Sequence, residues 1–315
     1  MKFYLGVTDF DWYNFLKDRN PEDINYWQPS GKRFGAIEKG APFLFKLKAP
    51  YNAISGVGFF SAFAAMPIAV AWEFFRERNG VPSFRDLRRK IEYYRQRQNV
   101  LPDPTMTIGC IILTDPVFFD RDEWIPQPEN WANSIVTGKS YSDAESIGAR
   151  LWEEVRLRLS SRRFYERNET ILNGMVSGSD GERYRDTVSR IRIGQGAFRM
   201  LVAEAYGRSC AVTGDHTLPV LEAAHIRSFA EDGPHLVSNG LLLRSDLHRL
   251  FDAGYVTVTD DYRFEVSPAI RKEYNNGKEY YSLHGRRLRV VPDTAGERPK
   301  TEYLRWHNEN VFRAG

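Results

Sequence analysis

Hydrophobic and polar positions follow a strand-like pattern over the first part of this chain. Up to about residue 135, short runs rich in β-branched and aromatic residues are separated by turn residues; the runs are KFYLGVT, PFLFKLK, AISGVGFF and TIGCIILTDPVFF. Such runs are typical of strands. Two stretches with helical spacing, near residues 61–78 and 83–97, lie between them. The pattern predicts a small mixed β-barrel with inserted helices.

A further helix is predicted after the barrel. In DAESIGARLWEEVRLRLSSRR, residues Leu151, Val155 and Leu159 are four residues apart and so lie on one helical face. Near residues 173–190 the composition changes from Gly and Ser to Arg with apolar residues, which is typical of a domain boundary. We interpret the helix as part of a connector between two domains. The predicted divisions are residues 1–140 (barrel), 141–185 (helical connector) and 186–315 (second domain).

The second domain has the pattern of a small unit of two strands and a helix. GAFRMLVAEAYG predicts a helix, PVLEAAHI and GLLLRS predict strands, and DLHRLFDAG predicts a second helix. The run YVTVTDDYRFEV then predicts a hairpin. Taken with the barrel, these elements predict an α+β fold class.

Composition is consistent with two folded domains and excludes a disulfide-rich protein. The chain of 315 residues is 42% hydrophobic and 14% aromatic, which is enough to bury two cores. The 44 Lys and Arg against 41 Asp and Glu give a net charge of +3, so attraction to an anionic partner must come from local patches. Cys110 and Cys210 are too far apart in sequence for a metal-binding pair, and they suit a reducing compartment.

The sequence contains no segment typical of a membrane or secreted protein. MKFYLGVTDFDWYNFL lacks the basic start, apolar core and cleavage site of a signal peptide. The longest apolar run, FFSAFAAMPIAVAWEFF, is interrupted by Pro67 and is shorter than the roughly twenty residues that a spanning helix needs. We therefore expect a cytoplasmic protein with no membrane partner.

Three polar residues stand out in the predicted strand, loop, strand and helix unit. His225 ends the first strand, Asn239 opens the second fourteen residues later, and His248 lies in the helix nine residues further on. This order and spacing resembles the HNH endonuclease family, whose fold is the ββα-metal finger, over roughly residues 190–258. The flanking phrases IGQGAFR, AYGRSCAVTG and NGLLLRSDLHRLFDAG are similar to those of a subfamily of restriction endonucleases.

The resemblance implies phosphodiester hydrolysis with a divalent cation, Mg²⁺ or alternatively Mn²⁺. His225 matches the general base, and a neutral imidazole can take a proton from water near neutral pH because its ordinary pKa is about 6.5. Asn239 matches the residue that braces the loop and so orients the base. His248 matches the second histidine, which in many members ligates the metal.

The sequence departs from the family pattern next to the predicted base. Family members often have a metal-ligating Asp or His there, whereas this chain has Ala224. Asp252 lies four residues after His248 and therefore on the same helical face, so we expect it to complete the metal site. Glu222, on the same side of the strand as Ala224, is the weaker alternative. A single protein ligand with waters would also suit Mg²⁺.

A second departure concerns the structural zinc that many members hold with two Cys pairs. Here Thr213 follows Cys210 at that spacing, and Arg244 and Leu247 occupy the places of the second pair. We therefore expect no structural zinc. His235 lies in the loop between the predicted strands, and two roles stay open for it: a hydrogen bond within the loop, or a contact with a phosphate.

Two basic segments are candidates for contact with DNA. RIRIGQG places a turn ahead of a helix N-terminus, where backbone N–H groups bind phosphates. RDLRRKIEYYRQR interleaves tyrosines with basic residues. An ordinary solvated basic face explains both segments about as well. The candidate DNA-binding residues are Arg190, Arg192, Gln195, Arg199, Lys32, Arg88 and Arg89.

Aromatic residues surround Gly-rich turns in INYWQPSGKRFGAIEKGAPFLFKLKAPYNAISGVGFFSAF. This layout resembles the PUA-like superfamily, especially the EVE-type and ASCH-type modules that occur fused to HNH nucleases. The resemblance implies a pocket that holds a flipped modified base. Trp27, which we expect in a loop, is the first candidate for this pocket, and packing in a barrel core is the alternative. The pocket candidates are Trp27, Tyr26, Asn25, Phe34 and Phe59, with Gln28, Ser30, Asp9 and Trp12 as further contacts.

Together these features predict a modification-dependent restriction endonuclease. Its predicted partner is double-stranded DNA carrying modified cytosine, read by base flipping and cut at a single-metal HNH site. A homodimer is expected, because a double-strand break needs two active sites. Two alternatives stay open: a non-catalytic nucleic-acid-binding protein with a degenerate finger, and an HNH nuclease gated by a sensor of RNA or a nucleotide. The sequence leaves the modification, its context and the cut position undetermined.

Overall fold

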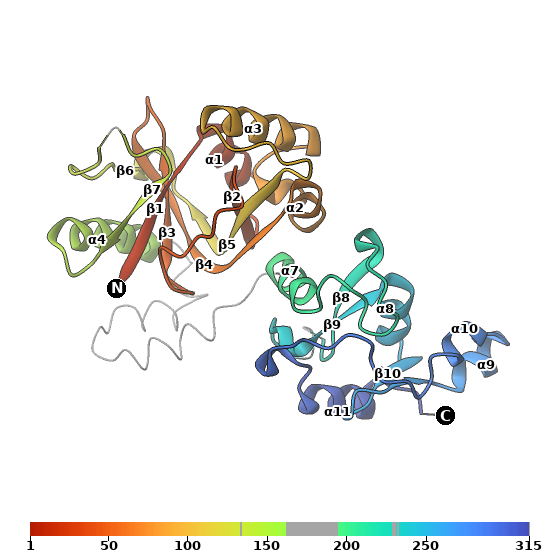
Figure 1. Cartoon of the computed structure of the whole chain (residues 1–315). Coiled ribbons are helices and arrows are strands. Elements are labelled where there is room, and N and C mark those ends of the chain that lie inside the picture. Colours follow the sequence, from red (N-terminus) through yellow and green to blue (C-terminus); the bar gives the residue numbers. More distant parts are fainter. Residues whose placement is uncertain (133, 162–194, 229–230, 232, 315) are drawn as a thin grey trace. The chain divides into compact units, whose positions relative to one another are not determined.

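The chain divides into two units in a computed structural model that describes residues 1–132, 134–161, 195–228, 231 and 233–314 (Figure 1). Residues Met1–Ala197 make up the first unit and Phe198–Gly315 the second. Both contain helices and sheet, so the predicted α+β class is confirmed.

A seven-stranded mixed sheet forms the centre of the first unit. Its order is β2-β5-β4-β3-β1-β7, and β6 pairs with β4. β1 and β3 are parallel, and the other pairs are antiparallel. The strands are β1 (Lys2–Thr8), β2 (Asp23–Gln28), β3 (Pro42–Leu47), β4 (Ala53–Pro67), β5 (Thr107–Phe118), β6 (Ile125–Pro126) and β7 (Gly138–Ser142).

Both faces of this sheet are buried. Successive residues of a strand point to opposite faces, and accordingly Phe43 and Phe45 belong to one apolar cluster whereas Leu44 belongs to another. The first cluster also contains Trp12 and Tyr26. Among the described residues, the helices of the unit are α1 (Phe10–Lys17), α2 (Ile68–Phe75), α3 (Phe84–Arg97) and α4 (Ser146–Ser161), with short 3₁₀ turns at Arg76–Asn79 and Arg121–Glu123.

The helix predicted as a connector packs on the sheet of the first unit. Leu151, Val155 and Leu159 of α4 are buried in the second apolar cluster. Their spacing gives α4 one apolar face, and this face is covered by the sheet. The remainder of the predicted connector, together with the predicted boundary at residue 186, falls within residues 162–194, which lie outside the described residues. The domain boundaries therefore stay a prediction.

The second unit contains the predicted pair of strands and the helix that follows. β8 and β9 are antiparallel, with His225 opposite Gly240. The elements are α7 (Gln195–Ala205), whose residues from Phe198 onward belong to this unit, β8 (Leu221–His225), β9 (Gly240–Arg244), α8 (Ser245–Asp252), β10 (Val256–Val258), β11 (Phe264–Val266), α9 (Ala269–Tyr274), α10 (Lys278–Tyr281) and α11 (Thr301–Asn310), with 3₁₀ turns at Leu218–Val220, Val237–Asn239 and Ala295–Glu297.

The C-terminal helix α11 packs against α8. Leu304 and His307 of α11 are buried, and the His307 ring stacks on Phe251 of α8 with centroids 3.7 Å apart. Residues of the C-terminal helix α11 therefore form part of the core that packs against α8. No helix among the described residues is long and apolar enough to cross a membrane.

Candidate functional site

His225 is the last residue of β8 and is partly buried. Its ring stacks on Phe198 with centroids 3.9 Å apart and an interplanar angle of 11°. Its Nε2 is 2.9 Å from Nδ1 of His235. Burial, with smaller contributions from His235 and His248, lowers the pKa of His225 from 6.5 to about 4. The imidazole is therefore neutral near pH 7 and can accept a proton.

Asn239 holds both ends of the loop between β8 and β9. Its side chain is fully buried. Oδ1 accepts a hydrogen bond from the backbone N–H of Arg227 at 2.9 Å, and Nδ2 donates to the carbonyls of Arg227 at 2.9 Å and Pro234 at 3.0 Å. Both amide hydrogens are thus used. The backbone carbonyl of Asn239 also accepts from Ile226, next to His225. These bonds fix the backbone that follows the predicted base.

His248, on α8, is flanked by two carboxylates. Its Nδ1 is 2.7 Å from Oε2 of Glu222 on β8, and its Nε2 is 3.3 Å from Oδ2 of Asp252. Burial raises the pKa of Asp252; the nearby His248 opposes this shift, and Glu222 adds to it. The structure therefore brings together all three residues that the sequence proposed as metal ligands.

The chemistry of these donors suits a hard divalent cation. One imidazole nitrogen and two carboxylates are ligands that Mg²⁺ and Mn²⁺ accept. Both carboxylates remain partly exposed, so they are accessible from solvent. Among the described residues, no group of three or more His, Cys, Asp or Glu side chains is arranged so that it could hold a metal ion. Cation binding would therefore require these side chains to move, and it would replace the contacts that His248 makes with the two carboxylates.

Residues 210–259 match the family model described as HNH endonuclease. This segment is an HNH endonuclease domain. The match spans β8, β9 and α8 and includes His225, Asn239 and His248. The HNH family generally depends on a divalent metal, in agreement with the donors around His248. The prediction of an HNH nuclease is confirmed.

Comparisons beyond the HNH domain give weaker matches. No curated protein matches the chain. The crystal structure of ASCH from Zymomonas mobilis is similar to it with a TM-score of 0.31 and 10% identity, covering 48% of this chain and 94% of the other. The modification-dependent TagI restriction endonuclease is similar with a TM-score of 0.30 and 15% identity, covering 93% of this chain and 76% of the other. Because both TM-scores are low, the assignment of function rests on the residues of this chain.

An aromatic cavity of about 370 Å³ lies in the first unit, separate in sequence from the HNH domain. Its lining includes the aromatic residues Trp12, Tyr26, Trp27 and Tyr94. Small-molecule sites usually measure about 300–1,000 Å³ and combine apolar walls with a few polar groups. Predicted residues that line it are Trp27, Tyr26, Lys32, Gln28, Ser30, Asp9 and Trp12.

Trp27 lies in a strand and not in the loop that was expected. β2 continues to Gln28, and Trp27 is opposite Cys110 of β5 in the ladder. Its indole Nε1 donates a hydrogen bond to the carbonyl of Asn79 at 3.0 Å. The ring is only partly buried and borders the cavity. Pairing with β5 therefore positions Trp27 at the cavity wall.

The other three residues predicted for this pocket are buried and do not line the cavity. Asn25 donates from Nδ2 to Oδ1 of Asn79 at 2.9 Å, and it is fully buried. Phe34 packs in the aromatic core, edge-on to Tyr4 at 5.1 Å. Phe59 on β4 is 1% exposed. The two phenylalanines therefore pack in the core, which was the alternative interpretation of the sequence.

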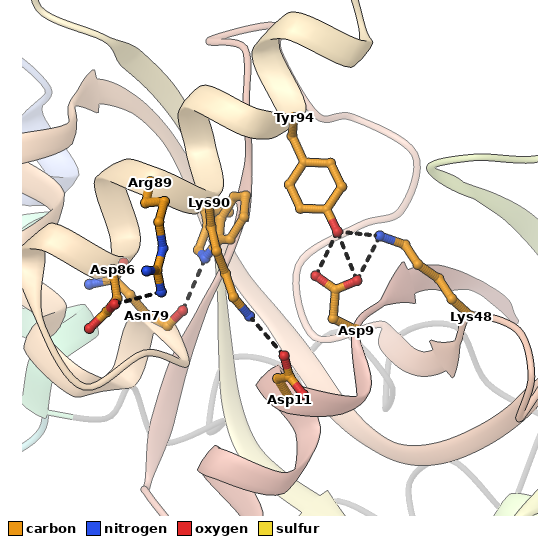
Figure 2. A network of polar contacts seen from close by, with 9 residues as sticks. Asp9, Asp11, Lys48, Asn79, Asp86, Arg89, Lys90 and Tyr94 are labelled. Atoms are coloured by element: carbon orange, nitrogen blue, oxygen red, sulfur yellow. Dashed lines mark hydrogen bonds and ion pairs between the residues drawn. The ribbon is translucent and has the colours of Figure 1, made fainter.

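A polar cluster of Asp9, Lys48 and Tyr94 also lines the cavity, and Figure 2 shows it from close by. The Lys48 ammonium donates to Oδ1 of Asp9 and to the Tyr94 hydroxyl, each at 2.7 Å. The Tyr94 hydroxyl lies 2.8 Å from both oxygens of Asp9, to which it donates. Burial and the bond to Asp9 raise the pKa of Tyr94. The hydroxyl is therefore a donor across the physiological range.

Sequence reasoning missed Lys48 and Tyr94 as pocket residues. The helical spacing of α3 contained a usable signal, because the buried Leu87 and Ile91 share a face with Tyr94. The position of Lys48 directly after β3 contained no signal that it would line the pocket. Its contact with Asp9 joins residues 39 positions apart and depends on the packing of the sheet.

A second cavity of about 490 Å³ shares the same polar cluster. Its lining includes Asp9, Lys48 and Tyr94, as well as Arg89 and Lys90 of α3. The Asp9 cluster therefore contributes to the walls of both cavities.

The predicted DNA-binding residues belong to several different segments of the chain. Arg88 and Arg89 are exposed on α3, and each pairs with an acid of the same helix at 2.9 Å, Glu92 and Asp86 respectively; the second pair is visible in Figure 2. Arg199 is partly buried on α7 and Gln195 begins that helix. Arg190 and Arg192 lie outside the described residues.

Proposed function

We propose that this protein is a modification-dependent DNA endonuclease. In this proposal the aromatic cavity of the first unit holds a modified cytosine extruded from duplex DNA, and the HNH domain cuts the DNA in the cytoplasm. The observation that carries the proposal is the arrangement around His225: a neutral imidazole, a loop fixed by Asn239, and two carboxylates in contact with His248.

The side chains of the HNH domain divide the work of hydrolysis between them. His225 takes a proton from the attacking water, and Asn239 keeps the His225 backbone in place. His248, Glu222 and Asp252 would hold one divalent cation, Mg²⁺ or Mn²⁺. The cation supplies stabilisation of the charge on the phosphate and on the leaving oxygen. The pKa of His225, about 4, keeps the base unprotonated before the reaction.

The aromatic cavity supports the reader part of the proposal by its chemistry. Base stacking on an aromatic side chain contributes about 1–3 kcal/mol, and Trp27 and Tyr94 present rings to the cavity. The Asp9 carboxylate retains lone pairs that can accept a hydrogen bond from an exocyclic amino group, such as that of cytosine. Lys32, at the cavity, would contact the backbone of the extruded nucleotide.

The test is digestion of otherwise identical DNAs that differ only in cytosine modification, with Mg²⁺ or Mn²⁺ present. We expect cleavage of at least one modified DNA and little cleavage of the plain DNA. His225→Ala should lower the rate by about 10²–10⁴, because it removes the general base, and should leave binding of modified DNA unchanged. His216→Ala is the matched control, since His216 is exposed and bonds to Ser209, away from the predicted base.

Two results would contradict the proposal in different ways. Equal cleavage of plain and modified DNA would contradict the proposed recognition of a modified base and would support only the nuclease function. Binding of modified DNA without cleavage in the presence of Mg²⁺ or Mn²⁺ would contradict the nuclease function and would indicate a DNA-binding protein.

A further inference from the structure

A second histidine lies against the predicted base. His235 comes from the loop between β8 and β9, and its Nδ1 is 2.9 Å from Nε2 of His225. The two rings meet edge to face, with centroids 4.9 Å apart and an interplanar angle of 65°. Phe198 packs against both, stacked on His225 and tilted at 5.6 Å from His235. The pair is therefore held by a hydrogen bond and by a shared apolar wall.

The hydrogen bond leaves one nitrogen of His225 for chemistry. Because Nε2 of His225 faces His235, a water molecule can give its proton only to Nδ1. Nδ1 accepts a proton only if the ring hydrogen is on Nε2, and Nε2 then donates to Nδ1 of His235. In the opposite arrangement His235 donates, and His225 carries its hydrogen on Nδ1. That form cannot act as a base.

We propose that His235 is a positioning residue that keeps His225 in the tautomer with its hydrogen on Nε2. The inference rests on the proposed nuclease function of the HNH domain and is independent of what the first unit binds. His235 does not touch the substrate in this proposal. It acts through His225, by accepting the Nε2 hydrogen before and during the reaction.

The hydrolytic step places a positive charge on this base. In the hydrolytic step an O–H bond of water breaks, its proton binds Nδ1 of His225, and the oxygen forms the new bond to phosphorus as the leaving oxygen departs with its electron pair. His225 is then positively charged in a partly buried site. A hydrogen bond from a charged donor is roughly twice as strong as one between neutral groups. Only a neutral His235 can accept this bond, because a positive charge on His235 opposes protonation of His225 and contributes to its lowered pKa.

Asn239 connects this pair to the loop. Its Nδ2 donates to the carbonyl of Pro234, directly before His235, and also to the carbonyl of Arg227, two residues after His225. The N–H of Leu236, directly after His235, bonds to Pro234 at 2.9 Å. One buried amide thus sets the backbone near both histidines. This explains how a residue of an irregular loop can hold a fixed distance to the end of β8.

The experiment compares two substitutions of His235 in the full-length protein. In His235→Asn, Oδ1 is attached to Cγ as Nδ1 is in histidine, so an acceptor stays near the same place. His235→Phe keeps an aromatic ring and removes the acceptor. Single-turnover cleavage at saturating DNA and Mg²⁺ measures the chemical step, and DNA affinity and the Mg²⁺ titration are measured for each variant. The nitrogen chemical shifts of the His225 ring report its tautomer.

We expect His235→Phe to cut roughly 10²-fold more slowly, within the range of about 10 to 10⁴ reported for loss of a group that orients a ligand or fixes a catalytic tautomer. Its DNA affinity and metal titration should match the parent. His235→Asn should recover most of the rate. In the parent the ring hydrogen of His225 should be on Nε2, and in His235→Phe this preference should be lost.

Three results would overturn the inference: parental cleavage by His235→Phe, an equal loss in His235→Asn, or a ring hydrogen on Nδ1 of His225 in the parent. The parent and His225→Ala serve as reference arms. If the parent does not cut any DNA, the proposed nuclease function fails and the inference fails with it. If the parent cuts and depends on His225 while His235→Phe cuts equally well, the positioning role alone is wrong.

Discussion

At the scale of single residues, His248 has an unusual position between two acids. Glu222 lies closer to it than Asp252 does, at 2.7 Å against 3.3 Å. Sequence reasoning ranked these two in the opposite order, because the helical spacing of Asp252 is visible in the sequence. The contact with Glu222 joins β8 to α8 and depends on how the helix packs on the strand.

We expect His248→Ala and Glu222→Gln each to raise the Mg²⁺ concentration for half-maximal cleavage by about tenfold or more, since each removes a donor. Cleavage at saturating Mg²⁺ should fall less. A metal titration of plasmid nicking measures this, with His216→Ala as the control. If Glu222→Gln titrates like the parent while Asp252→Asn does not, the ligand role belongs to Asp252 alone.

Trp27 is the residue whose removal should separate recognition from chemistry. Trp27→Ala should lose about 1–3 kcal/mol of preference for modified over plain DNA, because the stacking ring is gone. Cleavage of plain DNA should be unchanged. Trp27→Phe keeps a ring without the indole bond to Asn79 and should retain part of the preference. Competition binding with the two DNAs measures the effect, and Trp72→Ala, which does not line the cavity, is the control. Full discrimination by Trp27→Ala would assign Trp27 to the core.

At the scale of elements, the strands and helices with strong periodicity were the predictable part. The helix with Leu151, Val155 and Leu159 is present as α4, and the run around His225 is present as β8. Periodicity in the sequence predicts that a helix has an apolar face, but it does not predict which other element packs against that face. The sheet of the first unit covers the apolar face of α4, and β5 extends the β2 ladder past the expected start of a loop at Trp27.

The contact between α11 and α8 should make the stability of the second unit sensitive to acid. Burial lowers the pKa of His307 from 6.5 to about 4, and the hydrogen bond to the Phe251 carbonyl opposes this shift. The folded state therefore binds fewer protons than the unfolded state between these values, and stability is fully present above the unfolded pKa. It is lost as the pH falls from about 6.5 toward about 4.

Lowering the pH to about 5 should reduce the free energy of unfolding by on the order of 2 kcal/mol through His307. Urea unfolding at about pH 7.5 and about pH 5 measures the change. His307→Phe keeps the stack on Phe251 without a titrating group, so its stability should fall less between the two conditions than that of the parent. His225 has a similar shift, which both proteins share and which cancels in the comparison. Equal losses in both proteins would contradict the role of His307.

At the scale of the whole molecule, one chain contains one HNH site, and a double-strand break needs two. We therefore expect dimerisation, in solution or on modified DNA. The segment beyond residue 258 is the candidate contact surface, and packing on its own domain is the alternative, which the buried Leu304 and His307 favour for α11. Light scattering with and without DNA measures the mass, and the ratio of nicked to linear plasmid over time measures coupling of the two cuts. A strict monomer that accumulates nicked circles would make the protein a nickase.

The Asp9 cluster borders two cavities at once, and this has a consequence for how they fill. A ligand that draws Lys48 away from Asp9 in the aromatic cavity also alters the wall of its neighbour. Occupancy of the two cavities is then thermodynamically linked, and such linkage acts equally in both directions. An anion bound beside Arg89 and Lys90 would change the affinity of the aromatic cavity for a ligand by some factor, and that ligand would change the affinity for the anion by the same factor.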